Sequence, residues 1–396
     1  MNMNEQMKES EESILHTYNR FPVVFEKGQG CYLYDSEGKE YLDFAAGIAV
    51  NSLGYHYPGY DEALKDQIDK LMHISNLYYN EPIIEAGAKL VKASGMSKAF
   101  FTNSGTEAIE GALKAAKKYA YARDGHAGHE IIAMNHSFHG RSIGALSVTG
   151  TAHYREPFEP LMGGVKFADF NDLESVKAQI TDKTCAIITE VVQGEGGIYP
   201  AKKEFLEGLR RICDEKDIML IFDEIQCGMG RTGHYFAWQA YGVQPDIMTS
   251  AKALGCGVPV GAFVLSEKAA KASLEPGDHG TTYGGNPFVC AAVSKVFDIY
   301  ENDKIIEHVR ETAPYLEQKL DELVAKHECA ATRRGMGFMQ GIVIQGRPVG
   351  EVVKAALAKG LLVISAGSDV LRIVPPLVIT KEHIDKMATI LDECME

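Results

Sequence analysis

The middle of the chain alternates short apolar runs with amphipathic stretches. Six apolar runs have the length and the flanking turn residues of buried strands. They lie at residues 130–134, 164–168, 185–189, 218–222, 246–250 and 261–265. Helix-like segments such as residues 202–217 separate several of them. Apolar strands that alternate with helices predict an α/β domain whose mainly parallel sheet is covered on both faces.

The pattern changes after the "GGNP" motif. Long helical patterns follow over residues 287–327, and then apolar strands at 336–345 and 370–379 with another helix between them. This order predicts a smaller α+β domain. The pattern of residues 23–44 predicts a twisted hairpin with the turn "DSEG", and we expect this hairpin to pack against that domain. The expected organisation is an N-terminal segment over residues 1–55, a large domain over 56–290 and a small domain over 291–396.

Polar residues follow two of the apolar runs and precede one amphipathic helix. Because open α/β sheets bind ligands at the carboxyl ends of their strands, these residues are the first candidates for a site. Asp223 follows one run, and Lys252 follows another, just before the glycine-rich "ALGCG". Ser104, Gly105 and Thr106 stand where the helix begins, and the bare N–H groups of a helix N-terminus favour an anion.

Each of these features has an ordinary explanation when it is taken alone. Asp223 could cap a turn, Lys252 could be a surface lysine at a strand end, and "SGTE" could be a helix cap. Together they supply an amine for an aldehyde, an anion site for a phosphate and an acid for a ring nitrogen. Pyridoxal 5′-phosphate requires all three, so the combination favours this cofactor.

The composition narrows the alternatives. The chain has 396 residues and a formal net charge of −14, which argues against general binding to nucleic acids or anionic membranes. The polar first residues lack the apolar core of a signal peptide, and no apolar run reaches the roughly 18 residues of a membrane span. The eight cysteines form no C-x-x-C pair, which indicates reduced thiols. We therefore expect a cytoplasmic protein.

Longer motifs carry a resemblance to a known family. In chain order they are "GIAVNSLGY", "HISNLYYNEP", "NSGTEAIEGALK", "HSFHGRS", "QGEGG", "FDEIQCGMGRTG", "SAKALGCGVPVGA", "HGTTYGGNP" and "LRIVPPLVI". Nearly end to end, the sequence resembles the class III (subgroup II) pyridoxal-phosphate aminotransferases of fold type I, and among them the acetylornithine aminotransferases. The resemblance implies a large domain with a mainly parallel seven-stranded sheet flanked by helices, plus a smaller α+β domain.

The resemblance assigns a cofactor site. Lys252 would bond covalently to the aldehyde of pyridoxal 5′-phosphate, and its amine, once released, would move the substrate proton. Asp223 would pair with the pyridine nitrogen, and Phe138 would stack on the ring. Gln226 would lie near the phenolic oxygen. The other cofactor-binding residues would be Ser104, Gly105, Thr106 and Glu190, with Gly105 and Thr106 at the phosphate.

The resemblance also assigns substrate contacts and a partner subunit. Arg141 and Arg372 would each bind a substrate carboxylate, Arg141 in a bidentate manner. Glu195 would hold Arg372 when the substrate does not need it. Thr282 would reach the phosphate in the partner subunit, and Thr281 would lie beside the partner's substrate. The resemblance thus implies small-molecule substrates and a homodimer whose active sites are shared across the interface.

Two further patterns raise other kinds of site. "GMGRTG" matches the glycine spacing of dinucleotide-binding loops, but it begins five residues past Asp223 and lacks the later strand-end acid. Four histidines raise the possibility of a metal site, although no H-E-x-x-H motif or cysteine partner accompanies them. They are His126, His129, His136 and His139. We expect neither a dinucleotide nor a metal ion.

Two positions depart from the usual pattern of the family without removing a functional group. Val192 stands near a position where relatives often carry a proline-isoleucine pair, and Cys256 stands where glycine is commoner. Because Cys256 is close in sequence to Lys252, it could make the protein sensitive to thiol reagents.

The resemblance also suggests a substrate. Gly47 favours acetylornithine over ornithine, because ornithine δ-aminotransferases look to carry a tyrosine there. We expect transamination of N2-acetyl-L-ornithine with 2-oxoglutarate, as in arginine biosynthesis. Succinylornithine, ornithine or 4-aminobutyrate as the amino donor is the alternative within the family. A dinucleotide oxidoreductase and a cofactor-free dimeric interaction protein are the rivals from other classes.

Overall fold

A seven-stranded sheet forms the centre of the computed structural model, which describes residues 2–396. Across the sheet the strands are β4 (Lys98–Thr102), β12 (Gly261–Leu265), β11 (Ile247–Ser250), β10 (Met219–Asp223), β7 (Thr184–Glu190), β5 (Glu130–Met134) and β6 (Val165–Ala168). Every adjacent pair from β11 to β6 is parallel, whereas β12 runs antiparallel to both of its neighbours. The prediction of a mainly parallel sheet is confirmed.

The reversed strand β12 has a local cause. A parallel crossover needs a connection of a dozen or more residues, usually containing a helix. Residues 251–260 are too few for that, so the chain turns back beside β11 in the antiparallel direction. The six predicted apolar runs all lie on strands of this sheet, but their pattern does not distinguish the reversed strand from the others.

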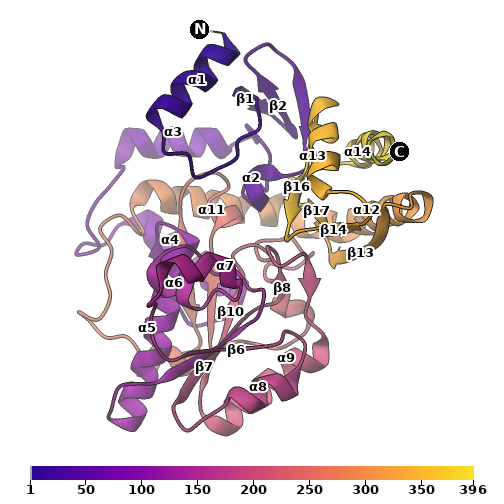
Figure 1. Ribbon diagram of the computed structural model, residues 1–396. Helices are drawn as coiled ribbons and strands as arrows, with labels where there is room; N and C mark the ends of the chain where they lie inside the picture. The colour runs from indigo at the N-terminus through magenta and orange to yellow at the C-terminus, as the bar shows by residue number, and fades with distance from the viewer. Residues whose placement is uncertain (1) are drawn as a thin grey trace.

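Both faces of the sheet are buried, as its nearly continuous apolar strands require. Ile131 packs into one apolar cluster with Ile109 on α5 (Gly105–Asp124). The next strand residue, Ile132, packs into the opposite cluster with Leu209 on α9 (Lys203–Lys216). Figure 1 shows α9 together with α8 (Leu173–Gln179) at the lower right of the central strands, and α5 at the left.

The N-terminal strands pair with a strand from the C-terminal part of the chain. This sheet contains β1 (Phe25–Gln29), β2 (Tyr32–Asp35), β3 (Glu40–Asp43) and β15 (Leu361–Leu362), and Leu42 lies opposite Leu361. The predicted "DSEG" turn joins β2 to β3, with the Gly38 N–H donating to the Asp35 carbonyl at 3.0 Å. In Figure 1 the indigo N-terminal and yellow C-terminal elements accordingly lie side by side above the central sheet.

The C-terminal part of the chain has its own antiparallel sheet. Its strands are β13 (Ala330–Met336), β14 (Met339–Ile344), β17 (Val370–Ile373) and β16 (Ile364–Ala366), in that order. The helices around it are α12 (Ile305–Lys326), α13 (Val349–Ala358) and α14 (Lys381–Met395). The helical pattern predicted over residues 287–327 breaks into α11 (Pro287–Asn302) and α12, because Lys304 adopts a left-handed conformation. The predicted domain boundaries remain predictions.

The other helices and strands are short or lie at the periphery. They are α1 (Met3–Ser13), α2 (Ala46–Ala49), α3 (Tyr60–Lys70), α4 (Glu81–Ser94), α6 (Ile143–Ser147), α7 (Ala152–Arg155), α10 (Glu267–Ala272), β8 (Val192–Gln193), β9 (Tyr199–Pro200) and the 3₁₀ helices Glu156–Phe158, Ala237–Ala240 and Lys252–Leu254. Among residues 2–396, no helix is both long and apolar enough to cross a membrane.

The "GMGRTG" segment makes a structural contact between the two parts of the chain. Arg231 is buried, and its guanidinium donates hydrogen bonds to the carbonyls of Phe338 and Pro375 in the C-terminal part. Burial lowers the pKa of Arg231 to about 10. A dinucleotide fingerprint opens a helix directly after its strand. Here a run of turns follows β10 and leads to the 3₁₀ helix Ala237–Ala240, so the segment lacks that geometry.

Candidate active site

The carboxyl ends of three neighbouring strands bring the predicted polar residues together. Asp223 ends β10 and lies in register with Glu190 at the end of β7. On its other side it is in register with Thr249 of β11, and Lys252 follows two residues after that strand ends. One cavity at this edge is lined by Phe138, His139, Glu190, Glu195, Asp223, Ile225, Gln226 and Lys252. Six of these eight residues were predicted as site residues.

Lys252 is a largely buried amine. Its backbone adopts a left-handed conformation with φ of 50°, which begins the 3₁₀ helix Lys252–Leu254 immediately after β11. Burial and the positive charge of Arg372 together lower the pKa of Lys252 to about 8, against the opposing effect of Glu195. An amine with this pKa is neutral, and therefore nucleophilic, in about a tenth of molecules at pH 7, a far larger fraction than for an ordinary lysine.

Asp223 is held rigidly at the bottom of the cavity. Its carboxylate accepts hydrogen bonds from the Ile225 N–H at 3.0 Å and from the Thr249 hydroxyl at 3.3 Å. Its other oxygen lies 2.8 Å from Nδ1 of His139. Both oxygens are held by these contacts and only 4% of the residue is exposed, so the carboxylate has one fixed orientation.

His139 is a site residue whose role the sequence did not predict. It appeared only among the four histidines of a possible metal site, yet its ring is buried against Asp223. Its Nε2 has no hydrogen-bond partner among residues 2–396. The signal that could have revealed it is its position in the loop after β5, at the same edge of the sheet as Asp223.

In the described part of the chain, the start of α5, the candidate anion site, leaves backbone N–H groups unpaired near this cavity. Ser104 caps the helix, and its hydroxyl accepts the Glu107 N–H at 3.3 Å. The first helical hydrogen bond joins the Ala108 N–H to the Ser104 carbonyl, so the N–H groups of Gly105 and Thr106 precede it and are free to bind a ligand. The Thr106 hydroxyl lies 2.8 Å from that of Ser142.

Two glycines let the loops approach this helix end closely. A Cβ at Gly105 would lie 2.9 Å from Cδ1 of Ile225, a residue that lines the cavity. A Cβ at Gly140 would lie 2.4 Å from Oγ1 of Thr106, and Gly140 has φ of 138°. The anion site and the cavity are therefore contiguous, because the glycine backbone packs directly against the side chains of Ile225 and Thr106, where larger residues would separate them.

An arginine–glutamate pair closes one side of the cavity. Nη1 and Nη2 of Arg372 lie 2.5 and 3.3 Å from the two carboxylate oxygens of Glu195, which is a bidentate geometry. Arg372 also donates to Gln226 at 3.1 Å. Burial alone would raise the pKa of Glu195, but Arg372 lowers it below its ordinary value. Glu195 thus neutralises the buried guanidinium of Arg372. The two residues lie on different segments, Arg372 on β17 and Glu195 on a loop.

Glu190 ties two loops to the cavity. Its carboxylate oxygens accept the N–H of Phe138 at 3.2 Å and the N–H of Gly194 at 3.0 Å. Burial, together with the nearby negative charge of Asp223, raises the pKa of Glu190 to about 7. Glu190 therefore fixes the backbone of Phe138 and the loop of Glu195 relative to the strand ends.

Besides Arg372 and the residues at the start of α5, three more predicted residues do not line this cavity in the single chain. Arg141 is exposed, with its guanidinium carbon 4.1 Å from the ring centroid of Tyr154 and 5.4 Å from that of Phe138. Thr281 accepts a hydrogen bond from the Asn103 side chain at 3.2 Å, near the start of α5. Thr282 is exposed. Arg141 is thus next to a cavity residue, whereas the structure does not bring Thr282 into the site.

The comparisons with known proteins agree with this geometry. A family model described as Aminotransferase class-III matches residues 14–395. The chain belongs to the class-III aminotransferases. The acetylornithine aminotransferase of Methanocaldococcus jannaschii is 49% identical over 383 residues, 96% of this chain and 95% of that protein. A succinylornithine transaminase of Yersinia pseudotuberculosis is 44% identical over 383 residues, 94% of this chain and 92% of that protein.

Solved structures extend the likeness to the fold. The ornithine aminotransferase from Toxoplasma gondii superposes with a TM-score of 0.95 and 29% sequence identity. The match covers 100% of this chain and 95% of that chain. The predicted family and fold class are therefore confirmed, and the protein is an aminotransferase enzyme.

The residues of this aminotransferase fit pyridoxal 5′-phosphate, the cofactor on which the class-III family depends. An amine with a lowered pKa faces a buried carboxylate across one cavity, and a helix end with unused N–H groups adjoins it. The amine suits the aldehyde, the carboxylate a protonated ring nitrogen, and the helix end a phosphate. This match of three donor types supports the cofactor independently of the family.

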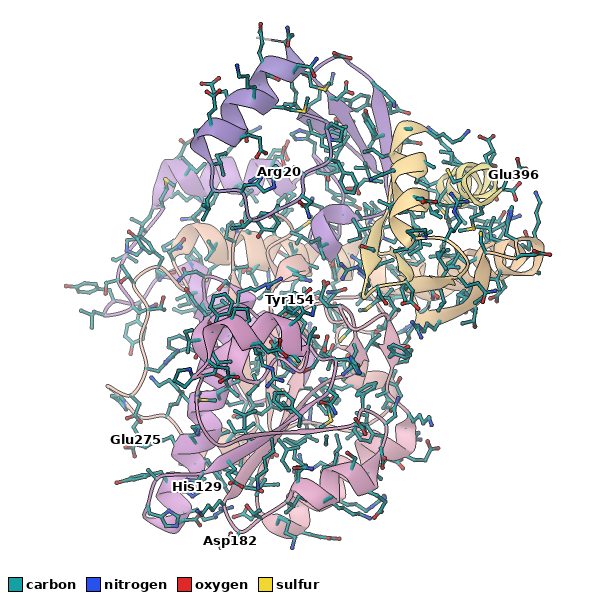
Figure 2. All side chains as sticks on the ribbon, in the orientation of Figure 1. Arg20, His129, Tyr154, Asp182, Glu275 and Glu396 are labelled. Carbon is teal, nitrogen blue, oxygen red and sulfur yellow. The ribbon has the colours of Figure 1, made fainter. Side chains whose placement is uncertain are left out.

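A possible metal cluster lies away from the site. Ligand atoms of Asp124, His126 and His129 come within 4.8 Å of one another. Arg123 already donates to both carboxylate oxygens of Asp124, and the two imidazole planes are stacked within 11°, which disfavours a shared cation. His129 precedes β5 at the amino edge of the sheet, and Figure 2 shows it at the lower end of the molecule, far below Tyr154.

Proposed function

We propose that this aminotransferase transfers the δ-amino group of N2-acetyl-L-ornithine to 2-oxoglutarate, giving N-acetyl-L-glutamate 5-semialdehyde and L-glutamate, as in arginine biosynthesis. The observation that carries the proposal is the pairing of Arg372 with Glu195, which lines the same cavity as Lys252. In N2-acetyl-L-ornithine the reacting amine is on a carbon that carries no carboxylate. In 2-oxoglutarate the reacting keto group is next to a carboxylate. A guanidinium that can be either neutralised or free accommodates both.

Lys252 would hold the cofactor and move the proton. Its amine is placed at the strand end facing Asp223, and its pKa of about 8 lets it accept and return a proton near neutral pH. When bound, pyridoxal phosphate supplies an electron-withdrawing ring that weakens the C–H bond beside the substrate nitrogen. Asp223, oriented by His139, would keep the pyridine nitrogen protonated. Lys252 would then carry the proton between the two carbons that exchange it.

The remaining predicted cofactor contacts divide by position. The N–H groups of Gly105 and Thr106 would bind the phosphate with help from Ser104. Phe138 would cover one face of the ring, and Gln226 would lie near the phenolic oxygen. Glu190 would act through its hydrogen bond to the Phe138 N–H. These assignments draw on the cavity lining and on the family likeness.

Carboxylate recognition would use the two arginines in turn. In the first half-reaction Arg141 would clamp the α-carboxylate of the donor while Glu195 keeps Arg372 neutralised. In the second, Glu195 would release Arg372 so that it binds the carboxylate beside the keto group of 2-oxoglutarate. Only a short segment would need to move in this exchange, because Glu195 lies between glycines in "QGEGG" and glycine backbone changes conformation easily.

The choice of amino donor rests on two observations. Identity is higher to an acetylornithine aminotransferase, at 49%, than to a succinylornithine transaminase, at 44%. Gly47 has φ of 63° and lies in the left-handed turn α2, where a larger side chain would be strained. Succinylornithine remains the nearest alternative donor, because it shares the δ-amino group and α-carboxylate of acetylornithine and differs only in its acyl group, which is longer and ends in a second carboxylate.

We also infer a homodimer that shares its active sites. The loop surface formed by Leu77, Tyr78, Tyr79 and Tyr283 is strongly exposed, with Tyr79 95% and Leu77 87% accessible. Thr282 lies on this surface. Thr281 beside it accepts a hydrogen bond from Asn103, which lies just before α5. A second copy covering the surface would bring Thr282 toward the partner's anion site. A cytoplasmic location is consistent with eight free cysteines.

Spectroscopy and kinetics test the proposal. The purified enzyme should be yellow, should lose that colour on addition of N-acetylornithine, and should regain it with 2-oxoglutarate. The specificity constant kcat/KM should be highest for N-acetylornithine in a panel with succinylornithine, ornithine and 4-aminobutyrate. A clear preference for 4-aminobutyrate would contradict the proposed substrate.

Mutagenesis tests the assignment of the lysine. Lys252→Ala should abolish turnover while still binding the cofactor non-covalently, whereas Lys271→Ala on exposed α10 should behave as wild type. Borohydride reduction followed by peptide mapping should label Lys252. Labelling of a different lysine would defeat the mechanism.

A further inference from the structure

The loop that carries Glu195 is seated on the C-terminal sheet by a second arginine. In that sheet Arg334 on β13 lies opposite Gly341 on β14, and Gly341 lies opposite Arg372 on β17. Directly paired residues of antiparallel strands point to the same face of the sheet. The two arginines therefore stand on one face with a glycine between them.

The glycine makes room for the loop. A Cβ at Gly341 would lie 3.2 Å from Cβ of Ile198 and 2.7 Å from Cγ1 of Val370. Ile198 itself has φ of 57°, an unusual conformation for a β-branched residue. The loop after Glu195 is thus pressed onto the sheet at the point midway between Arg334 and Arg372.

Each arginine holds one end of this loop. Arg372 binds the carboxylate of Glu195, and the Gly367 N–H, just before β17, donates to the Glu195 carbonyl at 2.9 Å. At the other end the guanidinium carbon of Arg334 lies 3.6 Å from the ring centroid of Tyr199. Nη2 of Arg334 would also lie 3.1 Å from a Cβ at Gly197.

The contact of Arg334 is a stacking contact. Within residues 2–396 its Nε is buried without a hydrogen-bond partner, and no carboxylate lies within ion-pair distance of it. A planar guanidinium over an aromatic ring supplies both attraction and orientation, which a lysine ammonium would not reproduce. The neighbouring Arg333 differs, since it is ion-paired with Asp321 at 2.7 Å.

We infer that Arg334 is a positioning residue: by stacking on Tyr199 it holds the loop so that Glu195 stays paired with Arg372 in the resting enzyme. This inference rests on the proposed exchange of partners at Arg372. In the open form of the enzyme Glu195 has released Arg372, and 2-oxoglutarate would bind only this form. If only a fraction of the enzyme is open, the apparent affinity for such a ligand falls in proportion to that fraction. Arg334 therefore weakens the apparent binding of 2-oxoglutarate and favours the amino donor, whose binding uses the closed pair.

The experiment compares the two half-reactions of the holoenzyme. Arg334→Met keeps an apolar stem but removes the stacking plane. We expect KM for 2-oxoglutarate to fall about threefold to tenfold, because the open fraction rises. KM for N-acetylornithine should stay the same or rise. Arg333→Met, the matched control on the same strand, should leave the ratio of the two KM values unchanged.

A second pair of variants separates positioning from a loss of folding. Tyr199→Leu, at a residue that is 42% exposed, should reproduce the shift, and Tyr199→Phe, which keeps the ring, should not. The double variant Arg334→Met/Tyr199→Leu should shift the ratio no further than either single variant, since both remove one contact. An unchanged ratio in both Arg334→Met and Tyr199→Leu, or an equal shift in Arg333→Met, would overturn the inference.

The outcome is separable from that of the proposed function. If the wild-type enzyme does not accept N-acetylornithine, the proposed substrate is wrong. The ratio is then measured with 4-aminobutyrate as the ω-amino donor and 2-oxoglutarate as before. A shift in that ratio would support the role of Arg334, and its absence would contradict it.

Discussion

Lys252 is a cation placed next to another cation in a poorly solvated cavity. Both burial and Arg372 oppose its protonation, so the folded protein binds this proton less tightly than the unfolded chain does. A group with a lowered amine pKa destabilises the folded state at low pH, and the penalty disappears as the pH rises through the ordinary pKa of lysine.

The first prediction follows from this linkage. In the cofactor-free protein, Lys252→Met should increase the free energy of unfolding by about 3 kcal/mol at pH 7, because the pKa falls from 10.5 to about 8. The difference should shrink between pH 8 and 10.5, where the unfolded chain still holds the proton and the folded protein does not. Urea unfolding of both proteins at several pH values measures it. A less stable Lys252→Met protein at pH 7 would contradict the prediction.

Cys256 has the environment of an unreactive thiol despite its position near Lys252. It is 6% exposed, its sulfur accepts the Leu53 N–H at 3.3 Å, and burial raises the pKa of Cys256. The thiolate, which is the reactive form, is therefore scarce. The thiol sensitivity suggested by the sequence is not supported by this geometry.

The second prediction concerns alkylation. Iodoacetamide should leave Cys256 unmodified in the native enzyme over hours and should modify it after unfolding. Cys329, which is less buried than the other cysteines of the described chain, should react first. Mass spectrometry of peptides at successive times measures both sites. Rapid native labelling of Cys256, with loss of activity, would contradict the prediction.

At the scale of elements, the anion site depends on how closely a loop approaches the start of α5. Gly140 provides this approach, since its φ of 138° and the 2.4 Å distance that a Cβ there would have from Thr106 both exclude a side chain. Gly125 at the other end of the same helix also has a positive φ, of 73°, but a Cβ there would meet nothing within 4 Å.

The third prediction compares these two glycines. Gly140→Ala should raise the Kd for pyridoxal phosphate at least about tenfold and destabilise the protein by about 1–3 kcal/mol. Gly125→Ala should cost about 1 kcal/mol through backbone strain and leave the Kd unchanged. Fluorescence titration with the cofactor and thermal unfolding measure the two effects. Equal cofactor affinities in the two variants would show that the approach of the loop is unimportant for binding.

At the scale of the whole molecule, one exposed surface joins segments distant in sequence. The loop of Leu77 and Tyr79 is held against residues 280–284 by the Asn76 side chain, which donates to the Gly284 carbonyl at 2.8 Å. The rings of His73 and Tyr283 also lie 5.2 Å apart. Large exposed apolar side chains gathered on one surface are typical of protein interfaces, so we propose that this surface is the contact of the dimer.

The fourth prediction tests that interface. The double variant Leu77→Asp/Tyr79→Asp should convert the dimer to monomers and remove most activity, because charges would be buried in the contact. Tyr121→Asp changes a residue that is 50% exposed on α5 and should leave the dimer intact. Sedimentation velocity and the transamination rate measure the outcome. A dimeric, active double variant would place the interface elsewhere.

The comparison of sequence and structure separates local from long-range information. The positions of six strands of the central sheet, the Ser104 cap and the placement of Asp223 and Lys252 at strand ends were predictable, because apolar periodicity and capping depend on neighbouring residues. The roles of Phe138 and Glu195 needed the family resemblance, since a lone aromatic or acidic residue carries no local signal. The sequence by itself therefore determined the α/β class and the chemical groups of the site.

Tertiary structure decided how those groups meet. The contact of His139 with Asp223 joins residues 84 positions apart, and that of Glu195 with Arg372 joins residues 177 apart. Whether such residues touch depends on the order and register of strands, which local patterns do not encode. The alignment of Arg334, Gly341 and Arg372 is likewise a property of the sheet register. The physical reason is that a strand's pattern specifies which face is buried but leaves open which strand lies beside it.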